Sequence, residues 1–314
     1  MRKHRMFVLG ASLLALALVA SACGDSGGDD TGDASPTETA SAEPQGELTI
    51  GVSGAFAENQ LVAEMYAQVL ENAGYTITRE LNLENREIGD QALESGDIDL
   101  KPEYTGFELG FWDPKATTNG SPEEVAAALG EAAAERGLVT YAISPANSTN
   151  VFVTLPATAE DRGLTDLSSV APVSGELTLG APADCPDQPF CLPGLKEVYG
   201  IEFAEVRPLD PGGKKTVAAL DSGAVDIAEF FSLDPTITDK GYVVLTDDQN
   251  LQANGNFVPL VREDVASEEL GALLDSVTTT LTDDNMREMV GQVQNEQRDL
   301  GDVASEYLTS AGIL

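Results

Sequence analysis

Two short segments of the chain share one pattern of alternating apolar and polar residues. Residues 46–52 read GELTIGV and residues 175–181 read GELTLGA, so the second segment begins 129 positions after the first. Alternation over a few residues that ends at glycine is typical of a short strand. The pattern therefore predicts two equivalent strands at the start of two similar units.

Two further pairs of segments repeat at almost the same offset. GYTITRELNLEN begins at Gly74 and GIEFAEVRPLDPG at Gly200, which are 126 positions apart. ALESGDIDL begins at Ala92 and ALDSGAVDI at Ala219, which are 127 positions apart. Each pair combines a helix end, a glycine and a short apolar strand. We therefore predict an α/β protein with two lobes, each with a strand–helix–strand–helix–strand order and a mostly parallel sheet.

Helical periodicity fills the segments between these strands. From residue 59 to residue 72 the apolar residues form one stripe that Gly74 ends, and Ser121-Pro122-Glu123-Glu124 is a capping box. Near the C-terminus two more apolar stripes predict helices that return to the first lobe. They consist of Leu270, Leu273, Leu274 and Val277, then Met286, Met289, Val290 and Val293.

Two extended segments flank the second lobe and predict two strands that cross between the lobes. They are NSTNVFVTLP from Asn147 and NGNFVPLVR from Asn254. The first lobe is then residues 46–148 and 257–314, and the second lobe is residues 149–256. Two crossings create a hinge and a cleft. Because ligands of α/β sheets bind at the carboxyl ends of strands, the cleft is the expected site.

The N-terminus has the features of an export signal. Positively charged residues 2–5 precede an apolar run that ends in Ala20-Ser21-Ala22-Cys23. Small residues before a cysteine are similar to a bacterial lipobox, which implies cleavage after residue 22 and a lipid on Cys23; ordinary cleavage that leaves a free thiol is the alternative. Residues 23–45 lack large apolar side chains and predict a flexible linker. We expect a lipoprotein anchored to the outer face of the cell membrane.

Charge and composition exclude several classes of function. The formal net charge is −36, which excludes binding to nucleic acid or to an anionic membrane surface through a basic patch. The one histidine is His4, inside the predicted signal, so the mature chain has no His-dependent nucleophile or His metal site. We expect a protein that binds no metal or cofactor and is not an enzyme. General acid–base chemistry by Asp97 with Asp99, or by Glu229 with Asp234, is the alternative.

Cys185 and Cys191 are the other two cysteines, six residues apart in a proline-rich segment. In the oxidising environment that export implies, a disulfide is the expected state, and two free thiols are the alternative.

Several short sequence motifs follow one another along the chain in a fixed order. They include AFAEN from Ala55, PEYTG from Pro102, SPANSTNVFV from Ser144 and FVPLVRED from Phe257. Over residues 46–314 the chain resembles the substrate-binding lipoproteins of glycine betaine/choline-type osmoprotectant ABC importers. The resemblance implies a type II periplasmic-binding-protein fold, closure of two lobes on a ligand, and delivery to a membrane permease driven by an ATPase. We expect a monomer.

The resemblance also implies a cage of aromatic rings around a quaternary ammonium. Tyr104 of PEYTG matches a cage position, and Phe231 stands where the family usually has tyrosine. The repeat supports this pair, because the two residues are 127 positions apart. We predict that the two rings approach the ligand from opposite lobes; the alternative is that both belong to the lobe cores. Other family positions differ: here they are Gly54, Phe107, Asn150 and Gly255.

Polar candidates lie at the crossings and at two turns. Asn147, Asn150, Asn254 and Asn256 either contact the ligand or satisfy the hinge backbone. Arg86 either binds a ligand carboxylate or pairs with Glu84 or Glu87, and Lys214 occupies the matching turn of the second lobe. The expected ligand is a small zwitterion or quaternary amine. An amino acid or another polar solute, and a ligand-sensing role without transport, stay open.

Overall fold

The computed structural model describes residues 45–54, 56–210 and 212–314. The predicted signal peptide and lipidated Cys23 lie outside the described residues. Within these ranges, none of the helices has both the length and the apolar character that a membrane span requires.

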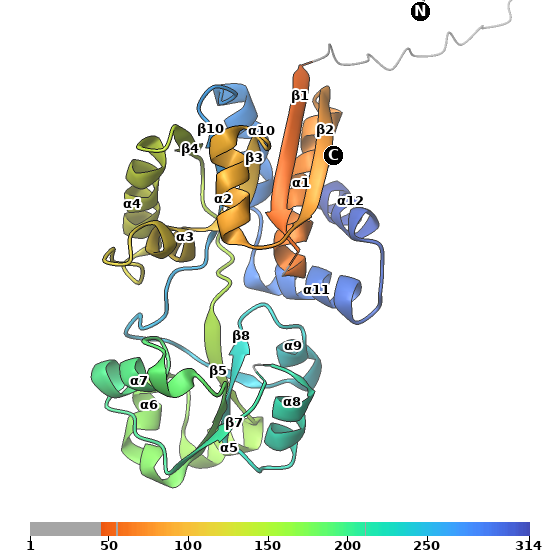
Figure 1. The fold of residues 1–314 in the computed structure, drawn as a ribbon. Coiled ribbons are helices and arrows are strands. Elements are labelled where there is room, and N and C mark those ends of the chain that lie inside the picture. The colour runs from red at the N-terminus through yellow and green to blue at the C-terminus, as the bar shows by residue number, and fades with distance from the viewer. Residues whose placement is uncertain (1–44, 55, 211) are drawn as a thin grey trace, which may run out of the picture. The chain divides into compact units, whose positions relative to one another are not determined.

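Two five-stranded sheets organise the described chain, and each has helices packed around it (Figure 1). The first sheet has the order β2-β1-β3-β10-β4 and the second β7-β6-β8-β5-β9. The strands of the first are β1 (Gly46–Ser53), β2 (Tyr75–Leu83), β3 (Leu100–Tyr104), β4 (Leu138–Thr140) and β10 (Phe257–Arg262). Those of the second are β5 (Asn150–Thr154), β6 (Thr178–Ala181), β7 (Glu205–Pro208), β8 (Ile227–Phe231) and β9 (Val243–Leu245).

Each sheet combines a parallel half with an antiparallel half. β1 runs parallel to β2 and β3, and β6 runs parallel to β7 and β8. The strand that follows a crossing, β10 or β5, is antiparallel to both of its neighbours. The α/β fold with two lobes is therefore confirmed, with mixed sheets, because each lobe inserts one strand that arrives from the other lobe.

The crossings themselves are shorter than the predicted segments. β5 and β10 are members of the two sheets, and between the sheets the two chain segments meet in one antiparallel bridge, Asn147 with Asn256. The lobe boundaries at residues 148/149 and 256/257 stay a prediction.

Helices cover both faces of the first sheet. Its largest core cluster joins the predicted stripe of α1, including Leu61, Met65 and Tyr66, to apolar residues of the C-terminal helices. The opposite face packs against Leu93 and Leu129. These helices are α1 (Ala57–Asn72), α2 (Arg86–Ser95), α3 (Thr105–Trp112), α4 (Pro122–Ala134), α10 (Glu268–Thr278), α11 (Asp283–Gln294) and α12 (Leu300–Ser310). The predicted capping box at Ser121 begins α4.

The second sheet also has a core on each face. One core contains Phe152, Leu177 and Leu195, and the other contains Phe230, Leu220 and Tyr242. The helices are α5 (Pro156–Arg162), α6 (Leu167–Val170), α7 (Leu192–Tyr199), α8 (Lys214–Asp221) and α9 (Thr236–Lys240), with short 3₁₀ turns η1 (Ala171–Glu176) and η2 (Cys185–Asp187).

The repeat extends to individual hydrogen bonds. The Asp99 carboxylate accepts from the Thr49 N–H at 2.8 Å, and the Asp226 carboxylate accepts from the Thr178 N–H at 2.8 Å. Each aspartate thus ties the third strand of its unit to the first. Asp97 accepts a hydrogen bond from the Ser95 hydroxyl at 2.9 Å. These hydrogen bonds give Asp97 and Asp99 structural roles, Asp97 in the turn and Asp99 between the strands.

Candidate functional site

A cavity of about 260 Å³ lies where the two lobes meet the crossings. Its lining falls into three chemical kinds. Four are aromatic rings, three are small polar side chains of the first crossing and β5, and two are charged. They are Phe56, Tyr104, Phe107 and Phe231; Ser148, Thr149 and Asn150; and Glu58 and Arg86.

The ends of two structural elements place the first-lobe rings. Tyr104 is the last residue of β3 and Phe107 lies in the first turn of α3. Tyr104 is buried, and its ring centroid lies 5.1 Å from that of Phe257 and 6.2 Å from that of Phe107. The Tyr104 ring is therefore fixed by the first-lobe core while one side of it lines the cavity.

Phe231 contacts a ring that the sequence had not singled out. It ends β8 in the second lobe and packs edge-to-face on Phe56, which precedes α1 in the first lobe, with ring centroids 6.1 Å apart. Phe56 is 44% exposed and Phe231 is 38% exposed, which is unusual for large apolar rings. Tyr104 and Phe231 line one cavity, and a Phe56–Phe231 contact joins the lobes at it.

Glu58 brings a buried carboxyl group to the same cavity. It lies in the first turn of α1, and its Oε1 accepts hydrogen bonds from the Tyr104 hydroxyl at 3.4 Å and the Ser148 hydroxyl at 3.3 Å. Burial raises the pKa of Glu58, and Asp234 adds to the rise, while the hydrogen bonds that it accepts oppose it. Glu58 is part of the AFAEN motif, but no local feature of the sequence indicated a role for it.

Arg86 lines the cavity with its charge already balanced. Its Nη2 lies 2.6 Å from Glu103 Oε1 and its Nε lies 2.8 Å from Glu108 Oε2. Both glutamates are buried. The expected alternatives of Glu84 or Glu87 as partners were therefore wrong, because the β3–α3 segment presents two carboxylates behind the cavity wall.

Arg86 belongs to a buried charge cluster with Asp90, Lys101, Glu103 and Glu108. Lys101 Nζ forms ion pairs with Asp90, with Glu103 at 3.4 Å and with Glu108 at 3.1 Å. Although burial opposes it, the cations Lys101 and Arg86 lower the pKa of Glu103. Burial and the Glu103 charge raise the pKa of Glu108 well above its usual value. Two cations face three carboxyl groups in this cluster, and each cation lies within ion-pair distance of at least two of them.

The buried charge cluster also positions Tyr104. Glu103 Oε1 accepts the Tyr104 backbone N–H at 3.0 Å, next to its contact with Arg86. Trp112 donates its indole N–H to Asp90 at 3.0 Å. Sequence reasoning missed this cluster. The available signal was that Lys101 and Glu103 directly follow the predicted apolar strand that ends at Leu100.

The four crossing asparagines divide between the cavity and the hinge. Asn150 lines the cavity. Asn147 Oδ1 accepts from the Gly255 N–H at 2.6 Å, Asn254 Nδ2 donates to the Gly120 carbonyl at 2.9 Å, and Asn256 Nδ2 donates to the Ser144 carbonyl at 3.0 Å. Asn147 and Asn256 thus join backbone groups of the two crossing segments, and Asn254 ties its crossing to the loop before α4. Lys214 is exposed at the start of α8 and is not among the residues that line the cavity.

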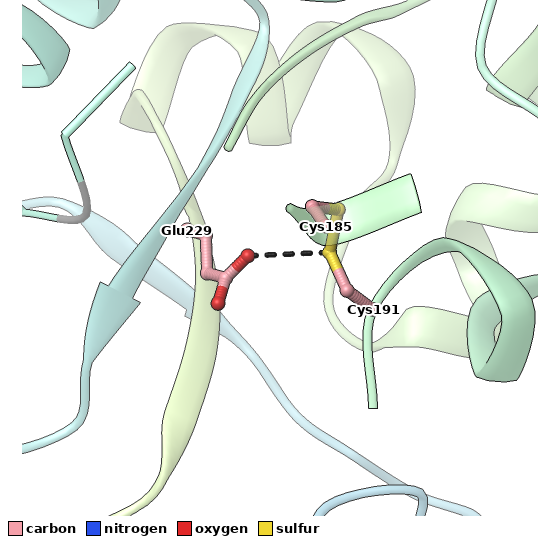
Figure 2. Close-up of side chains that lie close together, drawn as sticks. All are labelled: Cys185, Cys191 and Glu229. Carbon is pink, nitrogen blue, oxygen red and sulfur yellow. Dashed lines mark hydrogen bonds between the residues drawn. A yellow bond between two sulfur atoms is a disulfide. The ribbon is translucent and has the colours of Figure 1, made fainter. Parts of the chain in front are cut away.

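The predicted disulfide is present in the second lobe. Cys185 and Cys191 are bridged, and the Glu229 carboxyl of β8 extends toward them, with Oε2 3.2 Å from Cys191 Sγ (Figure 2). Burial and the nearby Asp184 raise the pKa of Glu229 to about 7. A bridged sulfur has no proton to donate, so the carboxyl in its protonated form donates to the sulfur.

Comparison with known proteins identifies the family to which this architecture belongs. Residues 46–310 match the family model described as the substrate binding domain of an ABC-type glycine betaine transport system. The glycine betaine-binding protein YehZ of Escherichia coli (strain K12) is 26% identical over 267 residues, which cover 81% of this chain and 88% of that protein.

Solved structures show the same fold. A glycine betaine/carnitine/choline ABC transporter structure gives a TM-score of 0.76 at 21% identity, covering 85% of this chain and 99% of the other. Apo YehZ from E. coli gives a TM-score of 0.74 at 23% identity, covering 87% and 100%. Because the family model matches residues 46–310, which are most of this chain, the chain belongs to the family of substrate-binding domains of ABC-type glycine betaine transport systems.

Proposed function

We propose that this chain is the extracytoplasmic solute-binding component of an ABC importer and binds a small quaternary amine or zwitterion in the cavity between the lobes. Four aromatic rings, three from the first lobe and one from the second, surround this small cavity, and this observation carries the proposal. Aromatic faces attract poorly hydrated cations by about 0.5–2 kcal/mol each. The family and the relatives named above support the same role, and delivery then goes to a membrane permease and its ATPase.

The lobes supply a means of capture. Phe56 and Phe231 come from different lobes and contact each other beside the cavity. A ligand that packs against both rings binds the closed arrangement better than the open one, and this difference in affinity drives closure. Three crossing asparagines hold the backbone at the hinge and leave the rings to contact the ligand.

The positions of Glu229 and Asp234, the acidic pair considered for catalysis, also favour binding over catalysis. Asp234 accepts a hydrogen bond from the Thr236 N–H at 2.8 Å at the start of α9, and Glu229 faces the disulfide. Neither carboxyl is among the residues that line the cavity. A substrate bound between the four rings is therefore not presented to this pair.

The test is calorimetric titration of the mature protein with glycine betaine, choline and a panel of amino acids. Removing one ring, by Tyr104→Ala or Phe231→Ala, is expected to weaken binding of a quaternary amine by about 10-fold, because each loses roughly 1–2 kcal/mol of cation–π and packing energy. Phe111→Ala is the matched control, since Phe111 is 48% exposed on α3 and is not among the cavity residues.

The aromatic site is contradicted if both cavity variants keep wild-type affinity while thermal melting shows that they are folded. Binding of an amino acid in place of both amines would contradict the proposed ligand class and leave the binding role intact.

We also propose that Cys23 carries the lipid that anchors the protein to the outer face of the cell membrane. Cys23→Ser is expected to remain unprocessed or to appear in the soluble fraction, because the acylated residue is lost. Fractionation of cells, followed by mass measurement of the N-terminal peptide, checks this expectation. Wild-type protein that washes off membranes without detergent would contradict it.

A further inference from the structure

Glu58 gives the cavity a further property, which rests on the proposed function of this cavity as the ligand site. Glu58 is 7% exposed, and its side chain reaches the cavity from the first turn of α1. Its carboxyl group accepts hydrogen bonds from the hydroxyls of Tyr104 and Ser148 and from its own backbone N–H, all of them neutral donors. Among the ion pairs of the described residues, none includes Glu58. The cavity thus contains a buried carboxyl group without a balancing cation.

The positive charge in the same wall is balanced. Arg86 is held by Glu103 at 2.6 Å and by Glu108 at 2.8 Å, and Lys101 pairs with the same two glutamates at 3.4 Å and 3.1 Å. The other lining groups are aromatic rings, two hydroxyls and one amide. A ligand carboxylate would therefore enter a cavity that contains another carboxyl group and no unbalanced cation. Burying a charge under these conditions is unfavourable.

We propose that Glu58 is the counter-charge for the ligand, so that the cavity selects a monocation without a carboxylate, such as a quaternary ammonium alcohol, over a zwitterion. The rings surround the ammonium group, and Glu58 balances its charge at the inner end of the cavity. Ser148, Thr149 and Asn150 line the same cavity and offer hydrogen-bonding groups for a hydroxyl of the ligand.

Ligand charge and the proton of Glu58 are then coupled. In the empty cavity burial favours the protonated carboxyl group, and the nearby Asp234 adds to this preference, while Tyr104 and Ser148 donate hydrogen bonds to it. Arg86 lines the same cavity with its charge balanced. A cation beside Glu58 favours the ionised form, so binding releases up to one proton and affinity rises with pH.

The experiment titrates three probes of similar shape into the mature protein: choline, its neutral isostere 3,3-dimethylbutan-1-ol, and glycine betaine. The wild type is expected to bind choline on the order of 10-fold or more tighter than either of the other two probes. Glu58→Gln keeps the hydrogen-bond acceptor and removes the charge. This substitution should weaken the binding of choline by about 10- to 100-fold. It should change the affinity for the neutral isostere by less than about 3-fold. Glu160→Gln, an exposed carboxylate of α5, is the control for net charge and should leave all three affinities unchanged.

A second readout is the number of protons released. Titration of choline in buffers of different ionisation enthalpy should show release by the wild type and none by Glu58→Gln. Thermal melting confirms that the variant is folded.

The outcomes separate this inference from the proposed function. If glycine betaine binds as tightly as choline, and Glu58→Gln weakens both equally or neither, Glu58 is not the counter-charge, while the aromatic cavity remains the site. If choline binds without proton release and Glu58→Gln leaves its affinity unchanged, the inference is also overturned. Failure of all three probes to bind would overturn the proposed ligand class and this inference together.

Discussion

Replacing Lys101 by methionine is expected to lower the free energy of unfolding by about 3–5 kcal/mol at pH 8, because one partner of a buried ionic network is lost. Lys101 is buried and lies within ion-pair distance of Asp90, Glu103 and Glu108. Without its ammonium group, three carboxyl groups share only Arg86. Methionine keeps most of the volume, so loss of charge dominates over a cavity effect.

The cost should depend on pH in a defined direction. The charge of Lys101 holds the pKa of Glu103 below its usual value. In the variant that carboxyl group binds its proton more tightly, so acidification relieves the unpaired charge. We therefore expect the difference between wild type and Lys101→Met to be smaller at pH 5 than at pH 8. Urea unfolding at both pH values measures it.

Lys115→Met is the matched control for this substitution. Lys115 is exposed after α3 and its side chain forms no ion pair in the described part of the chain. Its replacement should change the free energy of unfolding by less than about 0.5 kcal/mol. Equal effects of the two substitutions would show that the buried charge cluster does not hold the first lobe together. Because Glu103 also accepts the Tyr104 N–H, we expect the Lys101 variant to weaken ligand binding as well.

The repeat made much of the fold predictable from the sequence. Glycine-bounded alternation identified the parallel strands β1, β2, β3, β6, β7 and β8, since this pattern depends on local contacts along the chain. The antiparallel placement of β5 and β10 was not predictable in the same way. It depends on where a crossing delivers the chain, which periodicity does not encode.

The cavity was only partly predictable, for a related reason. Strand ends in a repeated unit pointed to Tyr104 and Phe231, and both line the cavity. Phe56 directly precedes α1 and Glu58 lies in the first turn of that helix, and nothing local in the sequence shows that this helix start faces the second lobe. The partners of Arg86 lie 17 and 22 residues away in sequence, on β3 and α3, whereas the sequence suggested either a ligand carboxylate or the nearby Glu84 or Glu87.

Three asparagines at the crossings show how residue type alone misleads. Amides suit ligand binding and hinge backbone equally well. Asn147, Asn254 and Asn256 direct their side chains to backbone groups of residues 255, 120 and 144, and each of these partners is more than 100 positions away in sequence. Only the distances between segments distinguish the two roles.

The second large effect is expected at Glu229, next to the disulfide. Burial and Asp184 raise the pKa of its carboxyl from 4.5 to about 7. The folded protein therefore binds this proton more tightly than the unfolded chain does. Stability contributed by the protonated carboxyl is fully present below about pH 4.5 and is lost as pH rises through about pH 7. At pH 8 the wild type should carry a penalty of up to about 3 kcal/mol from this one group.

Glu229→Gln should remove that penalty, because the amide is neutral at every pH and still has an N–H to direct at Cys191 Sγ. The variant is expected to be more stable than the wild type by about 2–3 kcal/mol at pH 8, and similar to it near pH 4. Denaturant unfolding of the oxidised proteins across this range measures the difference. The control Glu160→Gln alters an exposed carboxylate of α5 and should leave the pH profile unchanged. A Glu229→Gln profile parallel to that of the wild type from pH 4 to 8 would mean that folding does not raise the pKa of Glu229, and that its contact with the disulfide is not a hydrogen bond.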